Sequence, residues 1–386
     1  MSNAESSGIS PFRVAISYSD VSDLTERLAR TRWPEPATVS GWEQGTPLSF
    51  AQSLCSYWRD DYDFVAAEQR LNQFDQFTTV IDGLSVHFVH VRSHVPGAVP
   101  LVITHGWPGS VAEFWKVIGP LTDPAAHGLD PDLAFHVVCP SLPGYGFSGK
   151  PSSSGWSVQR TADAWDTLMT RLGYSRYGAQ GGDWGAAVTT CLGRQHSEHV
   201  LGIHLNMVTA PPPREALREP ASLSPRERDA LMALARYRDK DSGYSKQQST
   251  RPQSVGYGLV DSPAALCAWI TEKLWSWSDC DGDPLSVFTR EEMLDDIMLY
   301  WLPAAGASSA RLYWESFGQR DSTPVPVPAG CSVFPKDIFR PVRAWAEPLF
   351  PDLRYWNEPD RGGHFAAWEQ PELFVREVRA AFRAFR

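Results

Sequence analysis

The spacing of apolar residues changes along the chain, and each change predicts a different kind of structure. From Phe12 to about Asn72 aromatic residues stand in a helical setting, and little strand character is present. Within this stretch Asp23, with Glu26 three residues later, predicts the start of a helix. We therefore expect the amino-terminal segment, residues 1–75, to differ in structure from the part that follows.

Two short strands open the next part of the chain. Thr78–Val80 and Leu84–Val91 flank Asp82-Gly83, which predicts a hairpin with a tight two-residue turn. Short apolar runs and helical stretches then alternate, with strands expected at Leu101–Thr104, Phe135–Cys139, Tyr177–Gln180 and Ile203–Met207, and helices at Val111–Ile118, Thr161–Leu172 and Ala186–Gln195. This alternation predicts an α/β protein with a mostly parallel sheet that helices cover on both faces.

Three consecutive prolines, 211–213, interrupt this pattern. From there to about Tyr313 the chain is helical and rich in tryptophan, with no clear strand. Strands return at Val325–Phe334 and Leu353–Trp356, and Pro371–Phe385 predicts a closing helix. A helical insertion between two parts of one parallel sheet predicts a cap over the edge where ligands bind. The expected parts are an amino-terminal segment (1–75), a first core part (76–210), a helical cap (211–315) and a second core part (316–386).

Charge and composition narrow the classes of partner. The 386 residues carry 45 acidic and 35 basic side chains, for a net charge of −10, and no Lys/Arg-rich run, so neither nucleic acid nor a membrane surface is expected as a partner. No run of about 18 apolar residues occurs, and the polar first ten residues predict no signal peptide. Six scattered cysteines without a CxxC pair are typical of reduced thiols, so we expect a cytoplasmic protein. The oligomeric state stays open, with a homodimer as one option.

The sequence Gly181-Gly182-Asp183-Trp184-Gly185 lies between an expected strand and an expected helix. This is the setting of a nucleophile elbow, a sharp strand-to-helix turn, here with Asp in place of the usual Ser. Glycines allow the strained turn, and the helix N-terminus favours a negative charge on Asp183. An Asp nucleophile forms an alkyl ester, so its natural targets are sp3 carbons with a leaving group, such as epoxides or haloalkanes. The alternative is a glycine turn with a structural Asp.

Two later segments carry candidates for a general base and for the acid that orients it. His364 stands in a glycine-containing loop after the last expected strand, which agrees with the chain order nucleophile, acid, histidine. Asp337 follows the Val325–Phe334 strand, where the orienting acid belongs. Other carboxylates are close in sequence and remain alternatives for the acid: Glu347, Asp352 and Asp360.

A proline-containing loop follows the Leu101–Thr104 strand and reads His105-Gly106-Trp107-Pro108-Gly109. Elbow chemistry requires two backbone N–H donors for an oxyanion, one after the nucleophile and one from an earlier loop. We therefore expect the amides of Trp184 and Trp107 to form the oxyanion hole. Pro108 cannot donate and constrains the turn, and a cis bond before it is an option.

The remaining motifs predict neither a cofactor nor a metal. Gly144–Gly149 has the spacing of a dinucleotide-binding loop, but the residues after it do not open a helix. His87 and His90 lie three apart on a strand and face opposite sides. His196 and His199 could share a helix face, but no third ligand is evident.

Taken together, the motifs resemble those of the microsomal-type epoxide hydrolases. The resemblance covers nearly the whole chain and is carried by GGDWG around Asp183, by HGWPG, FPKD and RGGHFAAWE, and by the segment Phe12–Pro36. It implies an α/β-hydrolase fold with a helical cap and an amino-terminal meander. The membrane anchor of the microsomal enzymes is not evident, so the chain resembles their soluble bacterial and fungal relatives. The orienting acid here is Asp, whereas some members of the family use Glu.

The same resemblance implies that two tyrosines of the cap hold the epoxide oxygen. Tyr244, in the sequence DSGY, and Tyr313, in SSARLY, match the family positions. A leaving alkoxide needs a proton donor opposite the nucleophile, and a neutral phenol suits that role near pH 7. Tyr257 and Tyr300 are nearby alternatives.

The expected activity is the hydrolysis of a small-molecule epoxide to a vicinal diol through an ester on Asp183, which water activated by His364 then cleaves. A haloalkane dehalogenase shares the Asp and the His but needs a halide cradle rather than a tyrosine pair. A third hypothesis, a non-catalytic ligand-binding α/β-hydrolase, is disfavoured by the complete set of nucleophile, acid and base. Sixteen tryptophans suggest a pocket suited to aryl epoxides. Detoxification and secondary metabolism would both fit.

Overall fold

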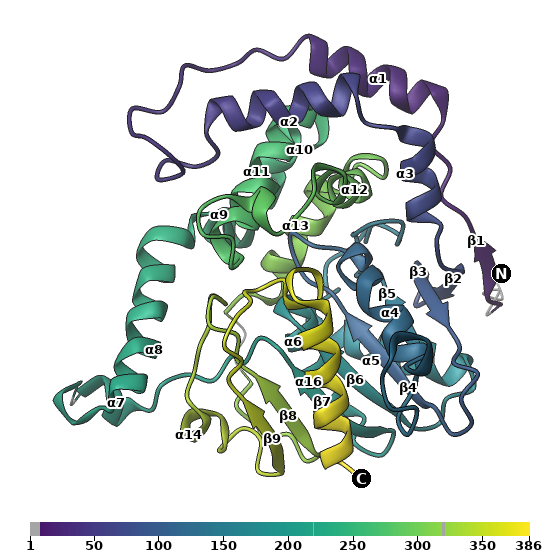
Figure 1. Ribbon diagram of the computed structural model, residues 1–386, viewed down its shortest axis with the longest axis vertical. Coiled ribbons are helices and arrows are strands. Elements are labelled where there is room, and N and C mark those ends of the chain that lie inside the picture. Colours follow the sequence, from purple (N-terminus) through teal and green to yellow (C-terminus); the bar gives the residue numbers. More distant parts are fainter. Residues whose placement is uncertain (1–7, 219, 319–320) are drawn as a thin grey trace.

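One nine-stranded sheet forms the centre of the molecule, in the order β1-β2-β3-β5-β4-β6-β7-β8-β9 (Figure 1). The computed structural model describes residues 8–218, 220–318 and 321–386. The strands are β1 Ser10–Phe12, β2 Gln76–Ile81, β3 Leu84–Val91, β4 Val99–Thr104, β5 Phe135–Pro140, β6 Tyr177–Gly181, β7 Val200–Leu205, β8 Ala329–Ser332 and β9 Leu353–Asn357. The first three neighbouring pairs are antiparallel and all later pairs are parallel, so the expected mostly parallel sheet is confirmed.

The expected hairpin is formed by β2 and β3. Ile81 pairs with Leu84 across a two-residue turn, and the central residues Asp82 and Gly83 have φ values of 49° and 74°. Positive φ at both central positions is the backbone of a type I′ turn, whose twist matches that of the paired strands. The Asp-Gly pair therefore determines both the place and the register of the hairpin.

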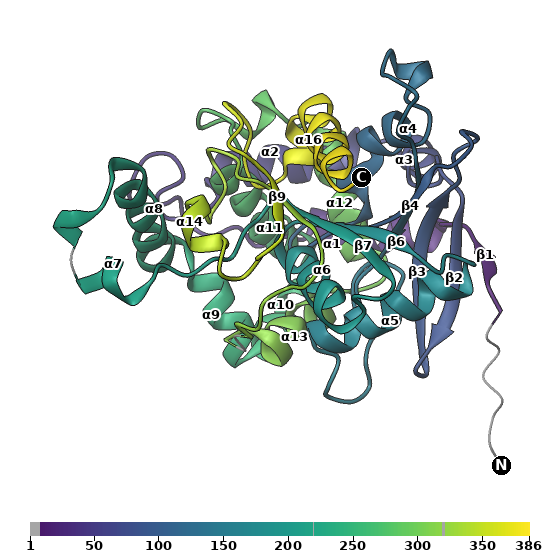
Figure 2. The same cartoon turned by 90° about the horizontal axis from the view of Figure 1, so that it is seen from below.

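Helices cover both faces of the sheet, as expected. The main ones are α4 Trp115–Thr122, α5 Val158–Arg171, α6 Asp183–Gln195 and α16 Pro371–Ala384, with short helical turns η1 Val111–Phe114 and η2 Ala125–His127 beside α4. α5 and α6 pack on one face, and α4 and α16 pack on the other (Figure 2). β4 lies between the two layers, and its Leu101, Val102 and Ile103 are fully buried, which explains its continuous apolar run.

Three helices lie between β1 and β2, and the first begins earlier than the sequence suggests. They are α1 Tyr18–Ala29, α2 Leu48–Asp60 and α3 Phe64–Leu71. The helix start expected at Asp23 is wrong, because Ser17 and Asp20 exchange side-chain and backbone hydrogen bonds in a capping box. Asp23 lies inside α1 and pairs with Arg27 one turn later, at 2.8 Å.

A helical region connects β7 to β8. Most of it lies above the sheet edge, whereas its first two helices lie beside the sheet (Figure 1). It comprises α7 Arg214–Arg218, η3 Pro220–Ser222, α8 Pro225–Arg236, η4 Tyr237–Asp241, α9 Gly243–Thr250, α10 Pro252–Asp261, α11 Pro263–Trp277, η5 Pro284–Ser286, α12 Arg290–Trp301 and α13 Gly306–Ser316. Asp295 of α12 joins this cap to the amino-terminal helices, accepting hydrogen bonds from the Tyr62 hydroxyl at 2.5 Å and from the Arg70 guanidinium at 2.6 Å. Within the described ranges no helix combines the length and apolar character needed to cross a membrane.

The carboxyl-terminal core part contains a shorter strand than expected. β8 covers only Ala329–Ser332 of the predicted Val325–Phe334, because Pro326 and Pro328 have no N–H to donate to a neighbouring strand. The last elements are α14 Arg343–Ala346, β9, α15 Ala366–Glu369 and α16. The loops that follow β8 and β9 both lie at the edge covered by the cap, because the two strands are parallel.

We expect Asp295→Ala to lower the free energy of unfolding by about 3 kcal/mol, because it leaves Arg70 and the Tyr62 hydroxyl without their buried partner. Chemical denaturation followed by tryptophan fluorescence measures the change. Asp23→Ala is the control, since it removes an exposed ion pair and should cost less than about 1 kcal/mol. Equally small losses for both variants would mean that the Asp295 contact does not hold the cap.

Candidate active site

Asp183 stands at a sharp turn between β6 and α6. It is the first residue of α6, and its φ of 49° lies in the left-handed region that residues other than glycine rarely adopt. The neighbouring glycines allow this turn to pack closely: a Cβ on Gly185 would lie 1.9 Å from the carbonyl oxygen of Thr104, and one on Gly181 would lie 2.2 Å from that of Gly185. A strained backbone held by close packing is typical of a functional residue. The strand–turn–helix geometry expected around Asp183 is present.

The Asp183 carboxylate is nearly enclosed, and only 8% of the residue is exposed. The Trp107 N–H donates a hydrogen bond to its Oδ1 at 2.8 Å. Burial raises the pKa of Asp183, while the His364 imidazole and the amides of Trp107 and Trp184 lower it. The two amides expected to form an oxyanion hole therefore act on the same carboxylate. The peptide bond between Trp107 and Pro108 is cis.

His364 lies between two carboxylates. Its Nε2 is 3.5 Å from Asp183 Oδ2, and its Nδ1 is 2.8 Å from Asp337 Oδ1. Asp337 is buried in the loop after β8. The alternative acids instead pair with neighbouring arginines: Glu347 with Arg343, Asp352 with Arg354, and Asp360 with Arg361. The structure brings Asp183, His364 and Asp337 together and leaves the other candidate acids outside the site.

The charges around His364 favour its protonated form. Burial lowers the pKa of His364, but the Asp337 carboxylate and then that of Asp183 outweigh this effect and raise the pKa to about 9. Near pH 7 an imidazolium therefore faces Asp183 and stabilises its negative charge. If Asp183 were converted to an ester, that charge would be lost and the pKa of His364 would fall.

Two tyrosines of the cap lie against the same tryptophan. Tyr244 of α9 stacks parallel on Trp107 with ring centroids 4.9 Å apart, and Tyr313 of α13 meets Trp107 edge-on at 6.0 Å. Both tyrosines are buried, and burial raises the pKa of both phenols well above the ordinary value, so both are neutral. The Tyr244 hydroxyl lies 3.1 Å from that of Tyr237, whereas the Tyr313 hydroxyl makes no hydrogen bond of normal geometry within the described residues.

The alternative tyrosines do not reach this site. Tyr257 is 71% exposed. Tyr300 is buried, but its hydroxyl donates to the carbonyl oxygen of Gly109 at 2.7 Å and so supports the loop that carries Trp107. The geometry therefore favours Tyr244 and Tyr313 as the pair that faces Asp183.

One glutamate that the sequence analysis did not single out holds the His364 loop. Glu369 of α15 accepts hydrogen bonds from the N–H groups of Gly363 at 3.0 Å, Phe365 at 2.9 Å and Asp279 at 2.7 Å. A single buried carboxyl thus fixes the backbone on both sides of His364 and ties it to the cap. The motif RGGHFAAWE already contains Glu369, and its position inside that motif was the available signal.

A small cavity lies directly beside Asp183 and His364. Its volume is about 10 Å³, close to the ~10–15 Å³ that one water molecule needs. Glu113 of η1 lines the same cavity and was also missed by the sequence analysis. The available signal was an acidic residue in an otherwise apolar stretch just beyond the carboxyl end of β4, where ligands bind in such sheets.

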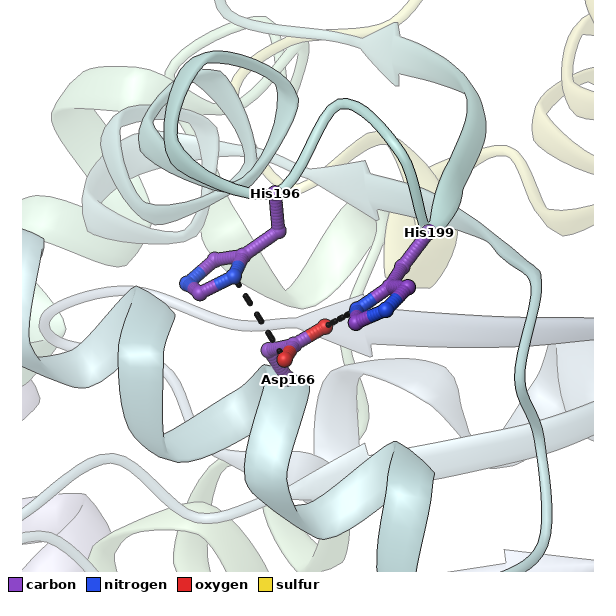
Figure 3. Close-up of side chains that lie close together, drawn as sticks. All are labelled: Asp166, His196 and His199. Carbon is purple, nitrogen blue, oxygen red and sulfur yellow. Dashed lines mark hydrogen bonds and ion pairs between the residues drawn. The ribbon is translucent and has the colours of Figure 1, made fainter.

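The structure corrects the expectation for His196 and His199. They do not share a helix face, because His196 follows the last residue of α6 and His199 precedes β7. The carboxylate of Asp166 of α5 lies beside both imidazoles (Figure 3), in the place where a third donor seemed absent. Asp166 Oδ1 is 2.7 Å from His199 Nδ1, and Asp166 Oδ2 is 3.4 Å from His196 Nδ1. Two imidazoles and a carboxylate are a donor set that could hold a metal ion. The group lies beside the first residues of β6 and β7, at the end of the sheet opposite to Asp183, and contributes nothing to the site described above.

Two family models and two solved structures define the fold class of the protein. The model of the α/β-hydrolase fold matches residues 99–253, and that of the epoxide hydrolase N terminus matches residues 9–114. The structure superimposes on the crystal structure of juvenile hormone epoxide hydrolase from the silkworm Bombyx mori with a TM-score of 0.92 and 33% identity, over 99% of this chain and 96% of that one. For the structure of the Aspergillus niger epoxide hydrolase, the TM-score is 0.87 and the identity is 31%. The match covers 99% of this chain and 98% of that one. The molecule is an α/β-hydrolase.

Full-length relatives then define the family. A Stigmatella aurantiaca protein, provisionally named an epoxide hydrolase, is 51% identical over 380 residues, which are 98% of this chain and 86% of that protein. Epoxide hydrolase 1 of Oryctolagus cuniculus is 37% identical over 97% of this chain and 88% of its own length. The chain belongs to the epoxide hydrolase family.

We expect His364 to titrate with a pKa of about 9 in the free protein and Asp337→Asn to lower that pKa, because Asp337 is the largest contribution that favours the imidazolium. The imidazole signals of His364 in an NMR pH titration give both values. Asp352→Asn is the control, since Asp352 pairs with Arg354 and not with His364. An unchanged pKa in Asp337→Asn would show that Asp337 does not set the charge of His364.

Proposed function

We propose that Asp183 attacks one carbon of an epoxide and forms a covalent ester with it. The carboxylate oxygen bonds to the carbon while the carbon–oxygen bond of the epoxide breaks, and a proton from Tyr244 or Tyr313 neutralises the oxygen that leaves. Both phenols are neutral and can donate. The imidazolium of His364 keeps Asp183 ionised until this step, which opposes the effect of burial.

The second step hydrolyses the ester. Formation of the ester removes the charge of Asp183, so the pKa of His364 falls. The proton that His364 loses restores the phenol that was deprotonated in the first step, and the neutral imidazole then takes a proton from water. The water oxygen attacks the Asp183 carbonyl carbon, and the amides of Trp107 and Trp184 stabilise the oxyanion, by about 3 kcal/mol per donor. When this intermediate collapses, the bond between the carbonyl carbon and the ester oxygen breaks, and the leaving oxygen takes the remaining proton of the water. The diol leaves with one oxygen from the epoxide and one from Asp183, and Asp183 is again a carboxylate beside the imidazolium of His364. No cofactor takes part in either step.

One observation supports this sequence of steps above all: a charged base and two neutral phenols are gathered around the nucleophile. His364 Nε2 lies 3.5 Å from Asp183 Oδ2, and Trp107, whose N–H donates to Asp183, carries Tyr244 and Tyr313 against its ring. An epoxide needs a nucleophile and an acid on opposite sides of the bond that breaks.

The same observation disfavours dehalogenation. A halide leaves as a stable anion and needs no proton, so it is best held by N–H donors. The cap groups beside Trp107 are instead two phenols, and the Tyr313 hydroxyl makes no hydrogen bond of normal geometry within the described residues. The aspartate and the histidine are common to both reactions, so the tyrosine pair is the feature that separates them.

We further propose that the protein works in the cytoplasm. All six cysteines are free and buried. Free thiols fit a reducing compartment, where disulfides do not persist.

We expect His364→Gln to accumulate the ester, because general-base catalysis of its hydrolysis is lost while Asp183 remains reactive. Hydrolysis should slow about a hundred- to ten-thousand-fold. Intact-mass spectrometry of the variant after mixing with epoxide should show a protein heavier by the mass of one epoxide. The double variant Asp183→Asn/His364→Gln is the control and should remain unmodified.

A single turnover of the wild-type protein in ¹⁸O-labelled water tests the origin of the oxygen. The first diol should carry no label, and the label should appear in Asp183. Labelled diol in the first turnover would mean direct attack by water and would remove the proposed ester.

Aromatic side chains surround the reacting groups, which predicts a preference among substrates. Trp107, Trp184 and Trp277 all contact one or both of the cap tyrosines. Apolar and aromatic contacts favour an aryl group. We expect kcat/KM for an aryl epoxide to exceed that for a short aliphatic epoxide by at least about tenfold, and competition assays with racemic pairs measure it. Equal values, or a preference for the small epoxide, would remove the aryl preference.

A further inference from the structure

Glu113 is a partly buried carboxyl that neither step above uses. It comes from η1, which follows the loop that carries Trp107, and it lines the small cavity together with Asp183 and His364. Neither Tyr244 nor Tyr313 lines this cavity. The cavity therefore reaches Asp183 without contact to the cap tyrosines, and it has room for about one water molecule and none for an epoxide.

The carboxyl of Glu113 packs directly against Gly109. A Cβ added to Gly109 would lie 1.5 Å from Glu113 Oε1, so a side chain at 109 would displace the carboxyl from this position. The Tyr300 hydroxyl holds the carbonyl oxygen of Gly109 at 2.7 Å and so fixes this turn. Within the described residues no hydrogen bond reaches the Glu113 carboxyl, so its polar atoms are available to a molecule in the cavity.

The surroundings of Glu113 favour its neutral form. Burial raises its pKa well above the ordinary value, and the nearby Asp296 carboxylate raises it further. Asp296 has its own partner in the Ser110 hydroxyl, at 2.6 Å. A neutral carboxyl both accepts and donates hydrogen bonds, so it can orient a water molecule without taking its proton.

We propose that Glu113 holds the hydrolytic water in this cavity, beside Asp183 and His364. This inference rests on the proposed ester mechanism and adds the residue that positions its second reactant. The water oxygen attacks the Asp183 carbonyl carbon, one of its protons moves to His364 Nε2, and the other is hydrogen-bonded to Glu113. Glu113 keeps its own proton throughout. Water thus reaches Asp183 from a cavity that the cap tyrosines do not line.

Rapid-quench kinetics with excess enzyme, followed by mass spectrometry of the peptide that contains Asp183, separates ester formation from ester decay. We expect Glu113→Leu to slow decay about 10- to 100-fold, the effect of one lost hydrogen bond to a reacting group, with formation unchanged. Glu113→Gln keeps a neutral acceptor at the same distance and should retain most of the wild-type decay rate. Glu113→Asp draws the carboxyl back by one methylene and should slow decay as Glu113→Leu does.

Glu377→Leu is the matched control for a lost buried glutamate. Glu377 of α16 is 1% exposed, bonds to Ser332, Tyr355 and Asn357, and does not line the cavity. It should leave the ratio of the two rates unchanged. If Glu113→Leu fails to fold, the comparison of Glu113→Asp with Glu113→Gln still decides the outcome.

The outcomes distinguish the two proposals. Two outcomes would overturn the role of Glu113. One is a wild-type decay rate in both Glu113→Leu and Glu113→Asp, and the other is an equal loss in the rates of formation and decay in all three variants. If the wild-type protein forms no ester on Asp183, the mechanism itself fails, whatever the variants do. Slow decay in Glu113→Leu and Glu113→Asp with normal formation and normal decay in Glu113→Gln supports the inference.

Discussion

A carboxylate buried in a strained turn is the constraint on which this site depends. At Asp183 the backbone adopts a left-handed conformation that is costly for a residue with a Cβ, and burial makes its negative charge costly as well. Three groups offset these costs: the N–H of Trp107, that of Trp184 and the imidazolium of His364. The groups that stabilise the charge are thus the ones that the chemistry requires, so stability and function put the same demands on this turn.

The arrangement depends on contacts between segments far apart in the chain. The N–H of His364 donates to the carbonyl oxygen of Trp277 in the cap at 2.8 Å, and Glu369 bonds to Asp279 as well as to the His364 loop. The cap is in turn held to the amino-terminal helices through Asp295. The position of the base therefore depends on the cap and on the helices between β1 and β2, which gives the amino-terminal segment a physical connection to the chemistry.

Local chemistry made much of the fold predictable. The Asp82-Gly83 turn, the apolar run of β4 and the glycines around Asp183 each depend on residues close in sequence, and the structure forms the expected hairpin, strand and turn. The predicted bounds of helices and strands were wrong where a nearby residue had a stronger effect on the backbone. Ser17 caps α1 before Asp23 can, and the prolines before Ala329 shorten β8 by removing N–H donors.

By itself the sequence determined which segments could carry a nucleophile, a base and an oxyanion hole, because glycines, strand ends and helix starts show up in short patterns. It left open which of four acids meets His364, and only the folded chain brings Asp337 to it. Only the tertiary structure shows that Asp166 lies beside His196 and His199. It also shows that Glu113 lines the cavity beside Asp183. The physical reason is that hydrogen bonds and cavities depend on distances between atoms, and these distances are set by packing among elements that the sequence separates by tens to hundreds of residues.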